Sequence, residues 1–173
     1  MQRVLIRDVP SQIGKEVFLQ GWVSVRRDHG KLVFLDVRDR SGSVQVVILP
    51  NHLESCVAVQ DVRNETIISL IGKVNERPAN AKKEGELTGG VEIEALELKI
   101  LAKGNEELPI DVSPVELDVN LDTLLNNRTV SLRHRKVQAI FKLYSLLLAG
   151  YDQACRNEEF LEIKTPKILS SAT

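Results

Sequence analysis

The sequence contains little cysteine and histidine, and neither residue type is grouped. Its two cysteines, Cys56 and Cys155, and its three histidines stand far apart in the chain, without the close spacing of metal ligands. A zinc site or other metal centre is therefore not expected. Two widely separated thiols fit a protein of a reducing compartment.

The sequence also lacks long apolar stretches. No hydrophobic run approaches the roughly 20 residues that a membrane-spanning helix needs. The opening residues MQRVLIRDVP have no apolar segment of the kind found in signal peptides. With 43% hydrophobic and 27% charged residues, the composition is typical of a folded globular protein. We expect a cytoplasmic protein with no membrane partner.

The net charge is close to zero, but acidic and basic residues are unevenly distributed along the sequence. The net charge of −1 taken alone argues against a nucleic-acid-binding protein. Residues 84–118, however, carry ten acidic side chains against Lys99 and Lys103, a local charge of −8 that leaves +7 for the remainder. A localised basic surface can bind phosphates whatever the total charge.

Residues 17–48 show the period-two alternation of three consecutive half-buried strands. Arg26–Gly30 and Asp39–Gly42 are the predicted connections, with Gly30 suited to a positive φ. In the second strand Phe34 shares its face with charged residues, not with the valines. An outer face with a ring, an amide and arginines suits single-stranded nucleic acid, because bases stack on rings and guanidinium groups meet phosphates. The alternative is that Phe34 lies under a loop and the charges only solvate a surface.

Two further strands are predicted at residues 66–76 and from residue 91. The alternation in the last strand slips by one residue at Ala95–Leu96, which indicates a β-bulge that would let the strand bend and close a small barrel. A weak helix is predicted at residues 52–61, with Asn51 as its N-cap. The long polar loop at residues 77–90 lies where many small barrels contact their ligands.

The period changes beyond an acidic, proline-containing stretch that we interpret as a hinge. A short helix is expected at residues 121–128. Residues 137–157 carry apolar side chains at helical spacing, which predicts an amphipathic helix. Phe160–Ile163 is then a predicted strand, stopped before Pro166. The apolar stripe of the long helix needs a partner that the rest of the chain hardly supplies, so a second domain is only begun here.

Two groups of segments carry a family resemblance. GWV and RDHG followed by VFLDVRDRSGSVQVV resemble the anticodon-binding domain of aspartyl-tRNA synthetases. LDTLLNNR, VQAIFK and EFLEIKTPKILSSAT, in the same order as in that family, resemble the start of its catalytic domain in the archaeal and eukaryotic type. The resemblance implies a mainly β fold with α elements. It comprises a five-stranded OB-fold barrel at residues 1–103, a hinge at 104–120, and at 121–173 the incomplete start of a class II α+β catalytic domain.

The resemblance also implies which residues bind tRNA. Phe34 matches the ring that stacks on the central anticodon uridine, and Gln45 matches the amide that recognises the same base. Glu92 matches the carboxylate that accepts a hydrogen bond from the third anticodon base, a cytidine in aspartate tRNA. Arg27 and Arg77 match basic positions along the anticodon loop. The expected partner is aspartate tRNA, with asparagine tRNA left open.

The C-terminal segments match motif 1, which builds the dimer interface of class II synthetases. The residues implied in that interface are Phe141, Tyr144, Leu148, Phe160 and Pro166, and packing within one subunit is the alternative. Ser170 and Thr173 match the edge of the amino-acid site. The sequence stops before motifs 2 and 3, so we expect no catalytic residue and no cofactor in this fragment. ATP, Mg²⁺ and a homodimer are expected of the complete enzyme.

Two other functions stay open. The chain could be a free-standing OB-fold nucleic-acid-binding protein with a dimerising appendage. It could also belong to an asparaginyl-tRNA synthetase or a close paralogue. In the resemblance, the RDRSG turn and the TPKILSSAT ending favour the aspartyl enzymes.

Overall fold

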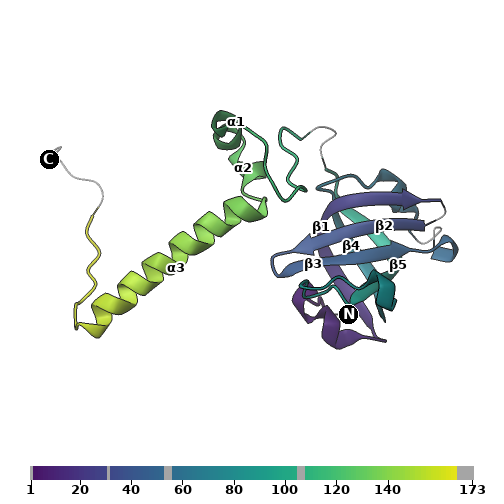
Figure 1. Ribbon diagram of the computed structural model, residues 1–173, viewed down its shortest axis with the longest axis horizontal. Coiled ribbons are helices and arrows are strands. Elements are labelled where there is room, and N and C mark those ends of the chain that lie inside the picture. The colour runs from purple at the N-terminus through teal and green to yellow at the C-terminus, as the bar shows by residue number, and fades with distance from the viewer. Residues whose placement is uncertain (1, 31, 53–55, 105–107, 167–173) are drawn as a thin grey trace. The chain divides into compact units, whose positions relative to one another are not determined.

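The structure is a computed structural model of the chain that describes residues 2–30, 32–52, 56–104 and 108–166. The chain divides into two compact units, Met1–Leu108 and Pro109–Thr173. Figure 1 shows strands in the first unit and helices in the second. Each unit is described separately below.

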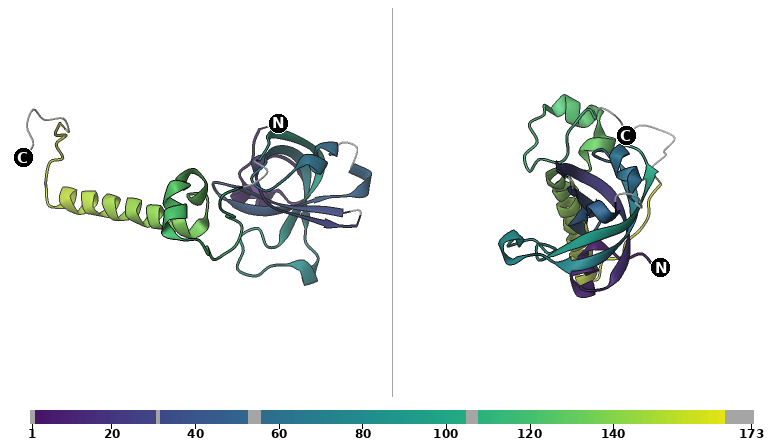
Figure 2. Two further views of the ribbon diagram at one scale, coloured as in Figure 1. Left: turned by 90° about the horizontal axis from the view of Figure 1, so that it is seen from above. Right: turned by 90° about the vertical axis from the view of Figure 1, so that its right-hand side faces the viewer.

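The first unit is a closed β-barrel. Its strands are β1 (Glu16–His29), β2 (Leu32–Asp39), β3 (Gly42–Ile48), β4 (Ile67–Glu76) and β5 (Val91–Ala102). They close in the order β1-β2-β3-β5-β4, with β3 and β5 parallel and the other neighbouring pairs antiparallel (Figure 2). The prediction of a five-stranded OB-fold barrel followed by helices is therefore confirmed.

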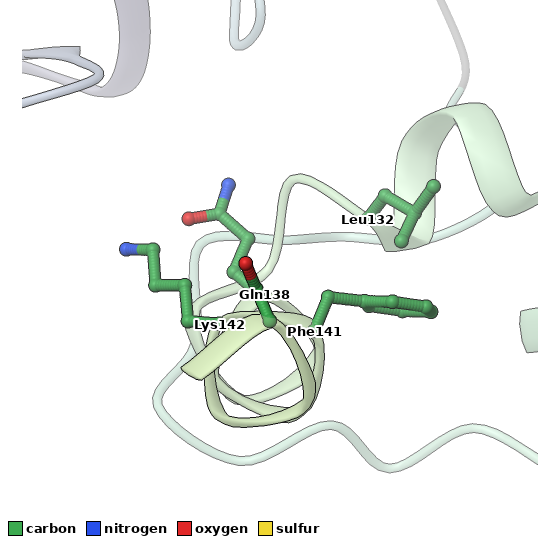
Figure 3. A pocket seen from close by; sticks show the side chains of 5 residues that line it. Leu132, Gln138, Phe141 and Lys142 are labelled. Carbon is green, nitrogen blue, oxygen red and sulfur yellow. The ribbon is translucent and has the colours of Figure 1, made fainter. Parts of the chain in front are cut away.

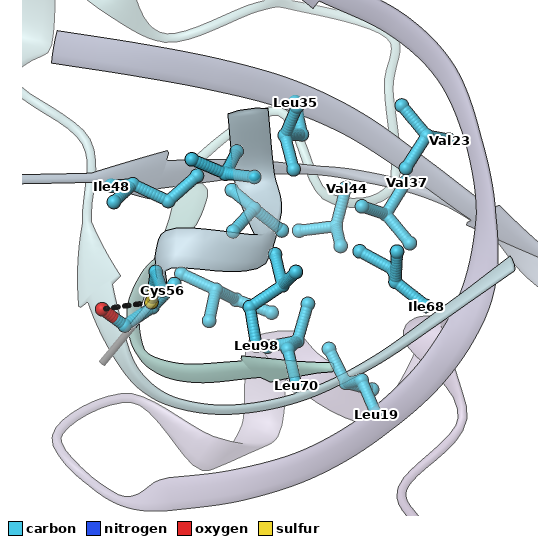
Figure 4. Close-up of a cluster of buried hydrophobic side chains, with 14 of the residues drawn as sticks. Leu19, Val23, Leu35, Val37, Val44, Ile48, Cys56, Ile68, Leu70 and Leu98 are labelled. Atoms are coloured by element: carbon cyan, nitrogen blue, oxygen red, sulfur yellow. Dashed lines mark hydrogen bonds between the residues drawn. The ribbon is translucent and has the colours of Figure 1, made fainter. Parts of the chain in front are cut away.

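The core of the barrel is built from alternate residues of every strand (Figure 4). On β1, Val17, Leu19 and Val23 are at most 1% exposed, as the period-two pattern predicted. Two further core residues, Ile6 and Val9, come from the 3₁₀ helix η1 (Ile6–Gln12). This short helix buries apolar side chains that show no strand alternation.

β1 is long because it serves two neighbours. Its first half pairs with β4 and its second half with β2, and the register shifts between Val23 and Val25. The predicted connection Arg26–Gly30 is wrong in its extent, because residues 26–29 are paired to β2. Gly30 follows with the expected positive φ of 62°. The ladder with β2 continues past the register shift to His29, and residues 27–29 are exposed.

The predicted bulge in β5 is confirmed. Ile71 of β4 pairs with Glu97, whereas the next residue, Gly72, pairs with Ala95. Leu96 is thus the extra residue. The extra residue shifts the alternation of inward and outward side chains by one position. Ala95 and Leu98 are therefore both buried, although they are three residues apart.

The link between β3 and β4 does not form the single helix predicted at residues 52–61. It contains two short 3₁₀ helices, η2 (Pro50–His52) and η3 (Val57–Asp61), and residues 53–55 lie outside the described part of the chain. Asn51 lies inside η2 and is not an N-cap. Tertiary contacts determine this conformation, because Arg26 Nη1 donates to the carbonyl oxygens of Val59, Gln60 and Val62 at 2.7–3.2 Å. A further 3₁₀ helix, η4 (Ala79–Ala81), lies in the loop before β5.

The second unit begins with an irregular segment and continues as helices. These are α1 (Leu121–Asn126), α2 (Arg128–Ser131) and α3 (Arg135–Asn157), so both predicted helices are present. Asn120 caps α1 by accepting a hydrogen bond from the Thr123 amide at 2.8 Å. His134 caps α3 through Nδ1, and its Nε2 contacts the Pro114 carbonyl oxygen at 2.8 Å. None of the helices in the described residues is long and apolar enough to span a membrane.

The strand predicted at Phe160–Ile163 is not present. Residues 160–166 form neither helix nor strand, and all of them are exposed. Alternation of apolar residues can favour an extended chain, but a strand also needs a neighbour that takes its backbone hydrogen bonds. Within the described residues no such neighbour pairs with this segment.

Candidate nucleic-acid interface

A row of polar side chains crosses the outer face of the barrel. Asp36 of β2 is opposite Gln45 of β3, Gln45 is opposite Glu92 of β5, and Glu92 is opposite Asn75 of β4. Gln45 Nε2 donates to Glu92 Oε2 at 3.4 Å. Each residue of the row is half-buried. The row therefore presents amide and carboxylate groups that are partly shielded from water.

An aromatic ring flanks this row. Phe34 is the next outward residue of β2 and is half-buried, and it lies outside the core as the alternation predicted. The His29 ring meets it edge-on, with ring centroids 5.7 Å apart and planes at 78°. A ring held in this way can offer a face to an unpaired base.

One arginine of the interface lies beside the same row. Arg27 is opposite Phe34 in the β1–β2 ladder, and its Nη2 donates to both carboxylate oxygens of Asp36 at 3.0 Å. Its side chain stays 43% exposed, so it can also meet a phosphate. The structure thus brings Arg27, Phe34, Gln45 and Glu92 onto one surface. We call this set the reading surface.

Arg77 is placed differently from the other four predicted tRNA-binding residues. Its backbone nitrogen donates to the Gly90 carbonyl oxygen at 2.9 Å, which joins the two ends of the loop at residues 77–90. The residue is only 5% exposed, and no hydrogen-bond partner for its Nε is found among the residues that the structure describes. The same loop is attached to β3, because Thr88 Oγ1 donates to the Ser43 carbonyl oxygen at 2.5 Å. Nothing in the polar sequence of the loop indicated this burial.

A second carboxylate lies on the outer face one step along β5. Glu94 accepts one hydrogen bond from Asn75 Nδ2 and contacts His52 Nε2, both at 3.1 Å. No binding role was predicted from the sequence for Glu94, Asp36, Asn75 or His52. Their outward position follows from strand alternation for three of them, but their contacts depend on pairings between distant strands. In the part of the chain that the structure describes, no group of three or more His, Cys, Asp and Glu side chains could hold a metal ion.

The residues assigned to motif 1 lie in the second unit. Phe141 lines a pocket of about 360 Å³ together with Leu132, Gln138, Lys142 and Ser145 (Figure 3). The Arg128 guanidinium lies 5.8 Å from the Phe141 ring centroid. Tyr144, Leu148 and Phe160 are 53–71% exposed, and Pro166 is exposed as well. Ser170 and Thr173 lie outside the described residues, so their predicted role stays a prediction.

The chain was compared with family models, with curated proteins and with solved structures. Residues 17–101 match the family model described as an OB-fold nucleic acid binding domain. Over 169 residues, 97% of its length, the chain is 37% identical to an aspartate–tRNA(Asp/Asn) ligase of Sulfurisphaera tokodaii, of which it covers 37%.

Among solved structures, a protein of Leishmania major described as an aspartyl-tRNA synthetase superposes with a TM-score of 0.84 at 24% identity. The superposition covers 99% of this chain and 36% of that one. An asparaginyl-tRNA synthetase of Pyrococcus horikoshii has a TM-score of 0.79 at 27% identity, covering 95% of this chain and 38% of that one. The chain spans between 27% and 37% of the length of the curated relatives it matches.

Proposed function

We propose that the chain belongs to the aspartyl-tRNA synthetase family and that the reading surface binds the anticodon of aspartate tRNA. The match of residues 17–101 to the OB-fold nucleic acid binding domains and the 37% identity to an aspartate–tRNA(Asp/Asn) ligase support both parts of the proposal. In this proposal Phe34 stacks on the central uridine and Gln45 hydrogen-bonds its edge. Glu92 accepts a hydrogen bond from the amino group of the third base, a cytidine. Arg27 meets the phosphates of the loop, and Arg77 supports the loop at residues 77–90.

The observation that carries the proposal is the contact between Gln45 and Glu92 beside Phe34. The amide and the carboxylate are 47 residues apart in sequence, and parallel pairing of β3 with β5 makes them neighbours. A half-buried outward ring beside two hydrogen-bonding groups suits two successive unpaired bases, because stacking supplies affinity and base edges supply selectivity. A surface that only kept the barrel in solution would not need an aromatic ring beside its polar row.

We propose that the ligation reaction itself belongs to the whole protein of which this chain is a part. That protein would be a class II aspartate–tRNA ligase, a cytoplasmic homodimer that uses ATP and Mg²⁺. We assign no step of the ligation to the residues of this chain. Its own contribution is tRNA binding by the first unit and, in the second, subunit contact through the exposed side of α3.

Two substitutions test the proposal on anticodon stem-loop RNAs. Phe34→Ala should lower affinity by about 1–3 kcal/mol, the value of one stacked base, with little change of base preference. Glu92→Gln should narrow the preference for cytidine over uridine at the third position, because an amide can donate as well as accept. The measurement is the dissociation constant of each variant for both stem-loops at one salt concentration.

A matched control comes from the other end of β1. Phe18 is also a half-buried aromatic residue on the outer face, but it pairs with Ile71, away from the reading surface. Phe18→Ala should leave RNA affinity unchanged. If Phe34→Ala binds as tightly as the Phe18→Ala protein, or if Glu92→Gln keeps the original preference, this surface does not read the anticodon.

The same measurement addresses the asparaginyl alternative. The anticodon of asparagine tRNA ends in uridine where that of aspartate tRNA ends in cytidine. An affinity ratio close to one between the two stem-loops would indicate a chain that accepts both tRNAs. A clear preference for uridine would favour an asparaginyl enzyme.

A further inference from the structure

Gln45 lies between two carboxylates on the outer face, and the two carboxylates differ in what they already bind. Asp36, opposite it on β2, accepts two hydrogen bonds from Arg27. Glu92, opposite it on β5, accepts from the Gln45 amide nitrogen at 3.4 Å. Because Arg27 compensates the charge of Asp36, Glu92 is the carboxylate that attracts the NH₂ group of Gln45.

A glutamine side chain ends in two chemically opposite groups. Its NH₂ group only donates hydrogen bonds and its oxygen only accepts them, whereas an ionised carboxylate only accepts. Glu92 therefore selects one of the two amide orientations, in which Nε2 is turned towards β5. The Gln45 oxygen is then the group left to meet a ligand.

The orientation of this amide decides which pyrimidine it can recognise. Uridine carries an N–H donor in the middle of its pairing edge, and cytidine carries an acceptor at the same place. An oxygen held towards the base accepts from uridine and repels cytidine, and a flipped amide would have the opposite preference.

We propose that Glu92 is a positioning residue for Gln45 and so sets the preference for uridine at the central anticodon position. This rests on the proposed function, in which Gln45 reads that base. One carboxylate then serves two positions, since it accepts from the third base and orients the group that reads the second. Selectivity at the two positions is coupled through Glu92.

The test uses the whole chain and stem-loops that share a cytidine at the third position and carry either uridine or cytidine at the central one. The readout is the ratio of the two dissociation constants. The original protein should prefer central uridine by about tenfold or more, the range of a good polar base contact. Gln45→Ala should bring the ratio close to one. Glu92→Gln and Glu92→Ala should each reduce it to about twofold or less, since the amide can then flip.

The double variant Gln45→Ala/Glu92→Gln gives the decisive comparison. If Glu92 acts on the central base only through Gln45, the double variant has the same ratio as Gln45→Ala alone. A matched control is Glu94→Gln, because Glu94 is the next outward carboxylate of β5 and contacts Asn75 and His52. Its ratio should equal that of the original protein.

Two results distinguish this inference from the proposal on which it depends. If Gln45→Ala abolishes the preference while Glu92→Gln and Glu92→Ala keep it, Gln45 reads the base without Glu92 and the inference fails alone. If Gln45→Ala has no effect on the ratio, Gln45 does not read the central base and the proposed function fails at that residue. Thermal unfolding of every variant checks that the barrel is intact.

Discussion

The two units of this chain treat their apolar residues in opposite ways. In the barrel, residues such as Leu35, Val46 and Ile93 are completely buried. In α3, by contrast, Ile140, Leu147 and Tyr151 are 63–73% exposed. The apolar side chains of the barrel pack into a core of their own, whereas those of the long helix are exposed. A closed core accounts for the first unit, and we expect α3 to bury its apolar side chains only by association, as proposed above.

The sharpest test of this contrast is the state of association in solution. An exposed apolar stripe of this size favours self-association, so the whole chain should form dimers or larger species as its concentration rises. A chain ending at Ile110 should remain monomeric. Light scattering over a range of concentrations measures both. Strictly monomeric behaviour of the whole chain at high concentration would show that the stripe is covered within one molecule.

Substitution of one leucine in each unit gives the next largest difference. Leu35→Ala should lower the free energy of unfolding by about 2–5 kcal/mol, because it leaves a cavity in a closed core. Leu147→Ala, at a site 63% exposed in the single chain, should change it by less than about 0.5 kcal/mol at concentrations low enough to keep the chain monomeric. Urea unfolding followed by circular dichroism measures both values. Similar losses in the two variants would mean that α3 is packed in solution.

Substitution of a glycine by alanine should change stability in opposite directions in the two units. A Cβ atom at Gly72 would lie 2.6 Å from the Glu94 carbonyl oxygen and 2.6 Å from Ile93 Cγ2, so Gly72→Ala should destabilise the barrel by about 1–3 kcal/mol. At Gly150 in α3 there is nothing within 4 Å of such an atom. Gly150→Ala should therefore stabilise the helix by about 1 kcal/mol. Thermal unfolding compares them, and a stabilised Gly72→Ala protein would refute the close approach of β4 to β5.

The smallest expected effect concerns acid and the end of α3. A hydrogen bond from Arg156 lowers the pKa of Asp152 below its ordinary value of 3.8. Because the folded state holds the lower pKa, the stabilisation is complete above that ordinary value and is lost as the pH falls below it. We expect a slight loss of helicity at low salt as the pH falls through this range. Asp152→Asn should remove this pH-dependent loss. Identical acid titrations of the two proteins would contradict the assignment.

The barrel could be predicted largely from the sequence because alternation has a direct physical cause. A strand with one face in the core must alternate, and the slip at Ala95–Leu96 appears as a break in that alternation. The contribution of Ile6 and Val9 to the core could not be predicted in this way, since η1 has too few residues to show a period. The missing strand at Phe160–Ile163 has a related cause, because the pattern of one segment does not reveal whether a neighbour exists.

The reading surface was predictable only in part. Phe34 could be placed on the outer face from the pattern of β2 alone. The contact of Gln45 with Glu92 could not, because no local pattern predicts which strands pair in parallel, and only the family resemblance suggested a shared role. The burial of Arg77 and the ion pair between Arg27 and Asp36 depend on how loops and side chains settle around these pairings.

The parallel seam between β3 and β5 also has a consequence for the order of events during folding. β1, β2 and β3 follow one another in sequence and can pair locally, whereas β3 and β5 must close a loop of more than forty residues, which slows their meeting. We therefore expect Phe34 and Arg27 to come together before the seam forms, and Gln45 and Glu92 only when it does. If these residues bind RNA as proposed, a chain that lacks the seam would bind through stacking and charge and would not distinguish bases.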